Sequence, residues 1–145
     1  MTTVLLSLND GALVRDAIAL FRESAGHEFP VVDDDGRLIG EISSRSILHR
    51  AVPLYASSDL LAAMRAGPDI PSVYDNLAGM LDHPLGEFMS RDVQTVSERT
   101  PTSAVAAMLS TMSGDSSHIY VVDDAGRLLG VISPRDIICR LPEHT

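Results

Sequence analysis

The sequence predicts an α/β fold in which two β-α-β-β-α units are related by a pseudo-twofold axis, with a helical insertion between them. Three observations lead to this prediction: an internal repeat, a hairpin signal inside each copy, and helical spacing of apolar residues on both sides of each hairpin. We expect each unit to form a three-stranded sheet with its helices on one face, and the two sheets to pack together across the axis.

The repeat is clearest between residues 31–50 and 121–140, which are identical at 13 of 20 positions. Each copy reads as an apolar strand, a turn and a second apolar strand. The first copy has an Asp-Gly turn ending at Gly36, a dipeptide that strongly favours a hairpin, and the second has Ala-Gly ending at Gly126. These segments therefore predict matching hairpins.

Helices and short strands complete each unit. Before the first hairpin, apolar residues at helical spacing predict one helix through Leu13, Ala17, Leu20 and Phe21, and a second helix is expected to begin behind Ser43. The short, half-apolar runs 3–8 and 92–97 predict the first strand of each unit.

The predicted organisation is a first motif over 1–50, a helical connection over 51–88 and a second motif over 89–145. Capping residues and helical spacing predict two short helices in the connection, beginning near Ser58 and Ser72. Their apolar faces either cover the core of this protein or form a surface for a partner.

Composition narrows the function. Lys+Arg 11 against Asp+Glu 20 gives a formal net charge of -9, which argues against binding to nucleic acid or an anionic membrane. The single cysteine, Cys139, rules out a disulfide framework and a thiolate metal cluster. No apolar run approaches the roughly 20 residues that span a bilayer, and no signal peptide is recognisable, so we expect a cytoplasmic protein.

Catalytic motifs are also missing from the sequence. It has no G-x-S-x-G elbow, no phosphate loop ending in Gly-Lys-Ser/Thr, no H-E-x-x-H and no plausible cysteine–histidine pair. We therefore expect a protein that is not an enzyme and that has no catalytic residues, no metal site and no permanent cofactor.

The segment GVISPRD, residues 130–136, is the sharpest local motif. Ser133 and Asp136 have the spacing of a capping box, and Pro134 stands where its missing N–H is harmless. The same carboxylate has the chemistry to accept two vicinal hydroxyls of a ligand. A helix cap and a ligand site are compatible interpretations of this motif.

Taken together, these features resemble a tandem pair of cystathionine-β-synthase (CBS) motifs, an arrangement called a Bateman module. The resemblance rests on the duplicated pattern PVVDxxGxLxGxIS, in which Tyr120 replaces Pro in the second copy, and on FMSRDVQTVSERTPTSAV before it. It implies a regulatory module that binds an adenosine compound such as AMP, ADP, ATP or S-adenosylmethionine between the motifs. It also implies a homodimer and an effector protein that responds to the ligand.

The family pattern of Gly, two apolar residues, Ser or Thr, two variable residues and Asp is complete only in the second unit. There the resemblance implies that Asp136 holds the ribose hydroxyls, with Ser133 near the phosphate–ribose region. The implied ligand-binding residues of this site are Gly130, Ser133, Arg135, Asp136, Val4, Leu5, Leu6, His27 and His118. Ordinary surface positions are the alternative for Arg135 and for both histidines.

The first unit departs from this pattern at two positions. Ser46 stands where the ribose carboxylate is expected, and Glu41 occupies an apolar position. A neutral serine cannot replace a carboxylate that accepts two hydroxyls, so we expect a weaker, altered or empty second site. Its residues are Ser43, Arg45, Ser46, Thr95 and Val96. A structural module that dimerises or docks a partner and has lost nucleotide binding is the alternative function.

Overall fold

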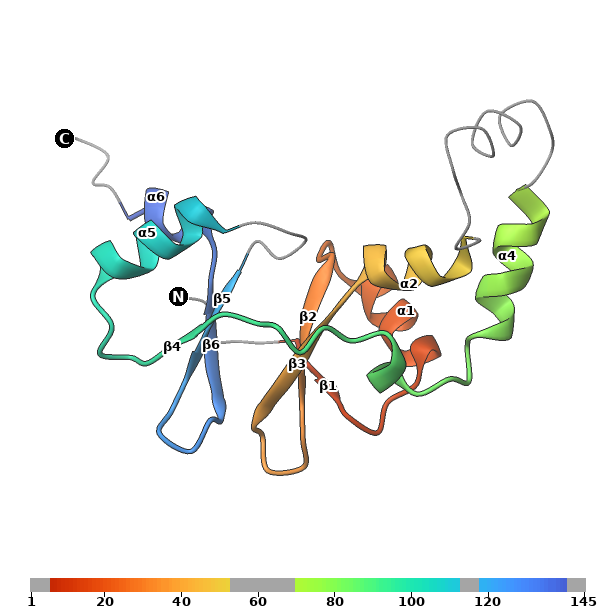
Figure 1. Cartoon of the computed structure of the whole chain (residues 1–145), viewed down its shortest axis with the longest axis horizontal. Helices are drawn as coiled ribbons and strands as arrows, with labels where there is room; N and C mark the ends of the chain where they lie inside the picture. Colours follow the sequence, from red (N-terminus) through yellow and green to blue (C-terminus); the bar gives the residue numbers. More distant parts are fainter. Residues whose placement is uncertain (1–5, 53–69, 113–117, 141–145) are drawn as a thin grey trace.

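A computed structural model describes residues 6–52, 70–112 and 118–140 (Figure 1). The first unit consists of β1 (Leu8–Asn9), α1 (Val14–Glu23), β2 (Glu28–Val32), β3 (Leu38–Ser43) and α2 (Ser44–Ala51). The second unit repeats this order with β4 (Thr95–Val96), α5 (Thr102–Thr111), β5 (Ile119–Val122), β6 (Leu128–Ile132) and α6 (Pro134–Ile138). Between them lie α4 (Ile70–Gly79) and the 3-10 turn η1 (Leu85–Glu87).

Each unit forms its own three-stranded sheet, in the order β1-β2-β3 and β4-β5-β6. In both sheets the first strand pairs in parallel and the hairpin pairs antiparallel. The two sheets face each other in the middle of the molecule, and the helices cover their outer faces (Figure 1). The hairpin turns meet where Leu38 N–H donates to Gly126 O at 3.0 Å and Leu128 N–H donates to Gly36 O at 2.9 Å. The predicted fold is confirmed.

Both hairpin turns have the same construction although their sequences differ. Gly36 and Gly126 adopt positive φ angles of 82° and 84°, which side chains disfavour. The residues that begin the turns, Asp33 and Asp123, each accept two backbone N–H bonds through Oδ1, all at 2.9 Å. The second copy therefore keeps the turn without the Asp-Gly dipeptide.

The first strands are shorter than expected. The runs 3–8 and 92–97 were predicted as strands, but among the described residues only Leu8–Asn9 and Thr95–Val96 pair with a neighbour. Residues 6 and 7 are not in a strand, and residues 3–5 lie outside the described part of the chain. Each first strand therefore pairs with the central strand of its sheet over two residues only.

Helix α4 lies where we expected a helix beginning near Ser72, and the helix predicted near Ser58 lies outside the described residues. Leu77 and Met80 pack against the hydrophobic core of the first unit. This favours the interpretation in which the connection covers the core of this protein. The predicted boundaries at residues 50 and 88 stay a prediction.

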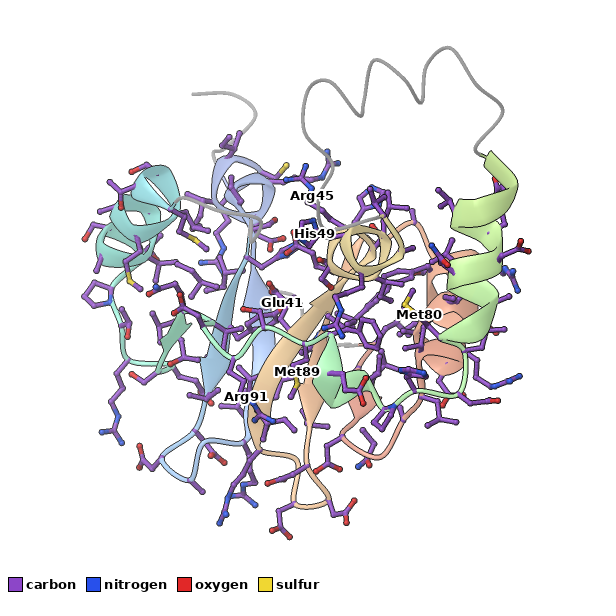
Figure 2. All side chains as sticks on the ribbon, turned by 45° about the vertical axis from the view of Figure 1, so that its right-hand side comes forward. Glu41, Arg45, His49, Met80, Met89 and Arg91 are labelled. Atoms are coloured by element: carbon purple, nitrogen blue, oxygen red, sulfur yellow. The ribbon has the colours of Figure 1, made fainter. Side chains whose placement is uncertain are left out.

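The segment that follows α4 packs on the first unit before the chain crosses to the second. Leu85 is fully buried and Phe88 is 5% exposed, both in the core of the first unit. Beyond them, Met89 lies beside β3 (Figure 2). A Cβ at Gly40 would lie 2.5 Å from Met89 Cγ, so only glycine fits under this crossing. None of the helices in the described ranges is long and apolar enough to cross a membrane.

Candidate functional site

Ser133 and Asp136 form the capping box that the sequence predicts. The Asp136 N–H donates to Ser133 Oγ at 3.3 Å, and the Ser133 N–H donates to Asp136 Oδ2 at 2.9 Å. The Ser133 hydroxyl also donates to Asp136 Oδ2, at 3.2 Å. Both hydrogen bonds to the Asp136 carboxylate use Oδ2, and no hydrogen bond within the described part of the chain reaches Oδ1. Capping therefore leaves one carboxylate oxygen for another partner.

A pocket of about 210 Å³ opens beside Asp136, between the second sheet and its helices. Its apolar wall consists of Val96, Val105, Val121, Ile132 and Ile137. Polar and charged groups complete the lining: Ser97, Glu98, Thr100, Thr102, Asp136 and Arg140. An apolar wall with a few polar groups at its edge is the usual construction of a small-molecule site.

The pocket joins Asp136 to the first strand of its own unit. We expected Val96 beside Ser46, and the other unit's residues 4–6 beside Asp136. Because β4 pairs in parallel with β5 of the same sheet, Val96 ends next to α6 and lines the Asp136 pocket instead. Leu6 is 51% exposed and does not line that pocket, and Val4 and Leu5 lie outside the described residues.

The remaining predicted residues of this site differ in their exposure. Gly130 is buried in β6, whereas Arg135 is exposed in the first turn of α6. His27 is exposed, and its carbonyl accepts the Ser44 N–H at 3.0 Å. Neither Arg135 nor His27 lines the Asp136 pocket. Both residues are therefore placed as expected if they occupy ordinary surface positions and do not bind a ligand.

In the first unit the equivalent cap is made by two serines. Ser46 N–H donates to Ser43 Oγ at 3.0 Å, and Ser46 Oγ donates to the Ser43 carbonyl at 2.8 Å. Thr95 is exposed on β4 and makes no hydrogen bond to this cap within the described part of the chain. A surface depression of about 350 Å³ lies next to Ser46, lined by Arg45, Ser46, His49, Arg50, Glu87, Phe88 and Met89.

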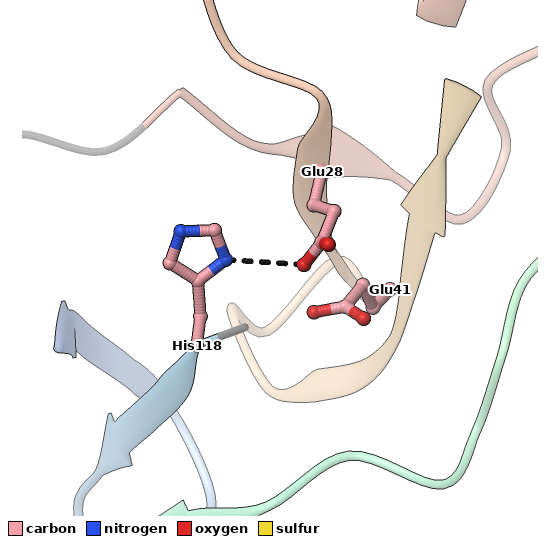
Figure 3. Close-up of side chains that lie close together, drawn as sticks. All are labelled: Glu28, Glu41 and His118. Carbon is pink, nitrogen blue, oxygen red and sulfur yellow. Dashed lines mark hydrogen bonds and ion pairs between the residues drawn. The ribbon is translucent and has the colours of Figure 1, made fainter. Parts of the chain in front are cut away.

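A cluster of titratable side chains joins the two units. His118, which precedes β5, lies 3.1 Å from Glu28 of β2, measured from Nδ1 to Oε2 (Figure 3). The Tyr120 hydroxyl donates to Glu41 Oε2 at 2.6 Å, and both residues are buried. Glu41 lies between the two sheets (Figure 2). We refer to Glu28, Glu41, His118 and Tyr120 as the interface cluster.

The interface cluster has a strongly negative environment. The hydrogen bond with Glu28 raises the pKa of His118, and the charges of Glu28, Glu41 and Asp136 raise it further, whereas burial opposes this change. Burial, together with Glu41, raises the pKa of Tyr120 well above its ordinary value. Tyr120 is therefore a neutral hydroxyl that donates to a buried carboxylate.

Three groups of the interface cluster have the chemistry of metal ligands. One ligand atom from each of Glu28, Glu41 and His118 lies within 4.8 Å of the others. Two carboxylates and an imidazole are a donor set for a divalent transition metal. In the structure Glu28 and His118 use these atoms to pair with each other, and Glu41 accepts from Tyr120.

Glu41 and Tyr120 depart from the repeat, and the sequence alone did not show that these two residues contact each other. Glu41 stands where the second copy has Val131, and Tyr120 stands where the first copy has Pro30. Pro30 pairs with Glu41 in one sheet, and Tyr120 pairs with Val131 in the other. The two unusual residues thus occupy partner positions and meet across the interface. Both substitutions fall on the same pair of facing positions in the two hairpins, and this coincidence could have predicted the contact.

Comparison with protein families finds the CBS domain in two segments of the chain, residues 1–53 and 85–143. Protein MJ1426 of Methanocaldococcus jannaschii is 29% identical over 132 residues, which cover 85% of this chain and 77% of that protein.

Solved structures with the same fold are more distant in sequence. CBSX2, a CBS-pair protein from Arabidopsis thaliana, superposes with a TM-score of 0.73 at 20% identity, covering 97% of this chain and 89% of CBSX2. MJ1225 from Methanocaldococcus jannaschii superposes with a TM-score of 0.71 at 24% identity, covering 98% of this chain. The chain spans only 46% of the MJ1225 chain and 56% of the related structure MJ1004.

Proposed function

Because the chain belongs to the CBS domain family and carries two such motifs, we propose that it is a regulatory module that senses an adenosine compound beside Asp136. The supporting observation is that the cap uses Asp136 Oδ2 only, at the edge of a pocket with an apolar wall. A carboxylate accepts hydrogen bonds from two vicinal ribose hydroxyls, and such charge-assisted bonds are about twice as strong as neutral ones.

The pocket suits one end of such a ligand better than a whole ligand. Its volume of about 210 Å³ is below the roughly 300–1,000 Å³ of pockets that enclose drug-sized molecules. A flat apolar base would contact Val96, Val121 and Ile132, with the ribose at Asp136 on the edge. The group beyond the ribose would then lie outside the apolar pocket.

Titration calorimetry on adenosine, AMP, ADP, ATP and S-adenosylmethionine tests this function. We expect at least one compound to bind the wild type, and Asp136→Ala to lose about 2 to 3 kcal/mol of affinity, or roughly 30- to 150-fold. Ser46→Ala is the matched control, because it removes the contacts of the Ser46 hydroxyl with the Ser43 N–H and carbonyl in the equivalent cap of the first unit and should leave affinity unchanged. Unchanged affinity in Asp136→Ala, or no binding by any compound, would contradict the proposal.

We also propose that the module forms a homodimer through the outer faces of α2 and α6. Leu48 and Ile138 occupy equivalent positions on these helices and are 50% and 70% exposed. Ile138 borders an apolar depression of about 230 Å³ between α5 and α6. The same surface would serve the alternative function, a dimerisation or docking module without a nucleotide.

Sedimentation velocity at micromolar concentration tests the homodimer. Leu48→Asp and Ile138→Asp should each shift the protein toward monomer, because burying an unpaired carboxylate in an apolar interface is costly. Tyr74→Asp is the control, since Tyr74 is 66% exposed and belongs to α4 rather than to α2 or α6. A monomeric wild type would contradict the proposal.

A further inference from the structure

Acidic groups outnumber basic groups around the Asp136 pocket. Among the described residues, Glu98 and Asp136 line it together with one basic residue, Arg140. A phosphate bound here would have to approach two carboxylates, and one guanidinium would not neutralise both its charge and theirs.

The interface cluster extends this negative region toward the first unit. It contains Glu28 and Glu41 against one imidazole, His118. The carboxylate of Asp136 is close enough to act on the same imidazole, since its charge contributes to the raised pKa of His118. The field around Asp136 is therefore negative on its pocket side and on its interface side.

The depression beside Ser46 in the first unit has the opposite charge. Among the described residues, it is lined by Arg45, His49 and Arg50 against one acidic residue, Glu87. Negative charge is thus a local property of the second site and does not follow simply from the net charge of the chain.

We infer that the Asp136 site selects its ligand by charge: it prefers an adenosine compound whose group beyond the ribose is neutral or cationic over one that carries phosphates. This inference rests on the proposed function. Its physical basis is Coulombic, because the repulsion between two like charges is several times stronger near a protein surface than in bulk water.

Two matched ligand pairs isolate the charge. Adenosine and AMP differ by a phosphate, and S-adenosylmethionine and S-adenosylhomocysteine differ by the methyl group that makes the sulfur cationic. Calorimetry at low ionic strength with a chelator present should show adenosine binding at least about tenfold more tightly than AMP, and S-adenosylmethionine about tenfold more tightly than S-adenosylhomocysteine. Only binding that Asp136→Ala abolishes is assigned to this site.

Variants in which an amide replaces a carboxylate test which carboxylates produce the charge preference. Glu28→Gln and Glu98→Gln should each reduce both ratios by roughly threefold to tenfold, because each removes one negative charge from one side of Asp136. Glu98 is exposed, so Glu98→Gln keeps the test valid if Glu28→Gln unfolds the protein. Glu87→Gln, the same substitution beside the first unit, is the control and should leave both ratios unchanged.

The results separate this inference from the function on which it rests. Failure of every adenosine compound to bind would overturn the proposed function and the inference together. Asp136-dependent binding in which AMP equals or exceeds adenosine, or in which S-adenosylhomocysteine equals S-adenosylmethionine, would overturn the inference alone. Unchanged ratios in both Glu28→Gln and Glu98→Gln would overturn the assignment to these carboxylates.

Discussion

In the first unit the groove between the sheet and its helices is filled by the chain itself, whereas in the second unit the equivalent groove is open. Leu8 and Val96 occupy equivalent positions in the two parallel strand pairs. Leu13 and Pro101 are likewise equivalent, since each is the N-cap residue of the first helix of its unit. On this basis, the residues of the first unit that correspond to the pocket lining include Ala12, Val14, Ala17, Val31, Ile42, Ser46, Ile47 and Arg50.

The turn η1 and the residue after it fill that groove. Leu85 and Phe88 pack in one core with Val14, Ala17 and Ile42. The Leu85 N–H donates to Ala12 O at 3.1 Å. Arg50, the counterpart of Arg140, donates to Glu87 O at 3.0 Å and lies 4.9 Å from the centre of the Phe88 ring.

The comparison shows how a repeated scaffold acquires two different roles. One copy uses its groove to hold the connecting segment and thereby gains stability. The other copy keeps an open groove, with the carboxylate of Asp136 in its lining. Two related sequences, identical at 13 of 20 positions between residues 31–50 and 121–140, thus differ in role because different segments of the chain pack against them.

The largest expected effect is on the filled groove. Leu85→Ala should lower the free energy of unfolding by about 2 to 5 kcal/mol, because it leaves a cavity at a fully buried position. Denaturant titration measures the loss. Leu6→Ala is the same substitution at a half-exposed position and should cost about 0.5 kcal/mol or less. Similar losses in both variants would show that η1 does not stabilise the first unit.

Most of the fold follows from local sequence signals. The repeat predicted both hairpins, and capping residues predicted the helices that begin behind Ser43 and Ser133. These signals work because turn conformation and helix ends depend on residues close in sequence. The first strand of each unit was predicted too long, because a short apolar run does not show where its pairing with a strand distant in sequence ends.

The site was less predictable because it depends on contacts between distant segments. Asp136 was selected by a local motif, but its partners Val96, Thr100 and Arg140 come from pairing and packing within the second unit. Nothing in the local pattern around Ser46 indicates that Leu85 and Phe88 fill the groove beside it. The contact between Tyr120 and Glu41 likewise requires the two sheets to be packed face to face.

That interface contact predicts the second largest effect. Tyr120→Phe should cost about 1 to 3 kcal/mol of unfolding free energy, because it removes a donor from the buried carboxylate of Glu41. Thermal or denaturant unfolding measures the change. Tyr74→Phe at an exposed position should change stability by no more than about 0.5 kcal/mol. A loss in Tyr120→Phe no greater than this control would mean that the hydroxyl does not hold the units together.

The pairing of His118 with Glu28 predicts a smaller, pH-dependent effect. The pKa of His118 is raised on folding, so its stabilisation is complete below its unfolded value of about 6.5 and is lost as the pH rises through the folded value. We expect a contribution of about 1 kcal/mol at pH 6 that is absent in His118→Ala.

Unfolding free energies of both proteins between pH 5 and 9 would measure this contribution, since the two curves should converge as the pH rises. His83 and Glu87 form an exposed pair at 3.2 Å, so His83→Ala is the control for loss of a surface pair and should change the unfolding free energy by about 0.5 kcal/mol or less. Curves for wild type and His118→Ala that remain parallel throughout would contradict the prediction.

The smallest expected effect comes from placing the missing carboxylate in the first unit. Ser46→Asp restores the family pattern and the capping box seen at Asp136, so it should stabilise the protein by only about 0.3 to 1 kcal/mol. It should not create a second ligand site, because Leu85 and Phe88 already fill the groove that the carboxylate would border. Calorimetric stoichiometry should therefore stay at the wild-type value per chain. A doubled stoichiometry would mean that the missing carboxylate, and not the filled groove, prevents the first unit from binding the ligand.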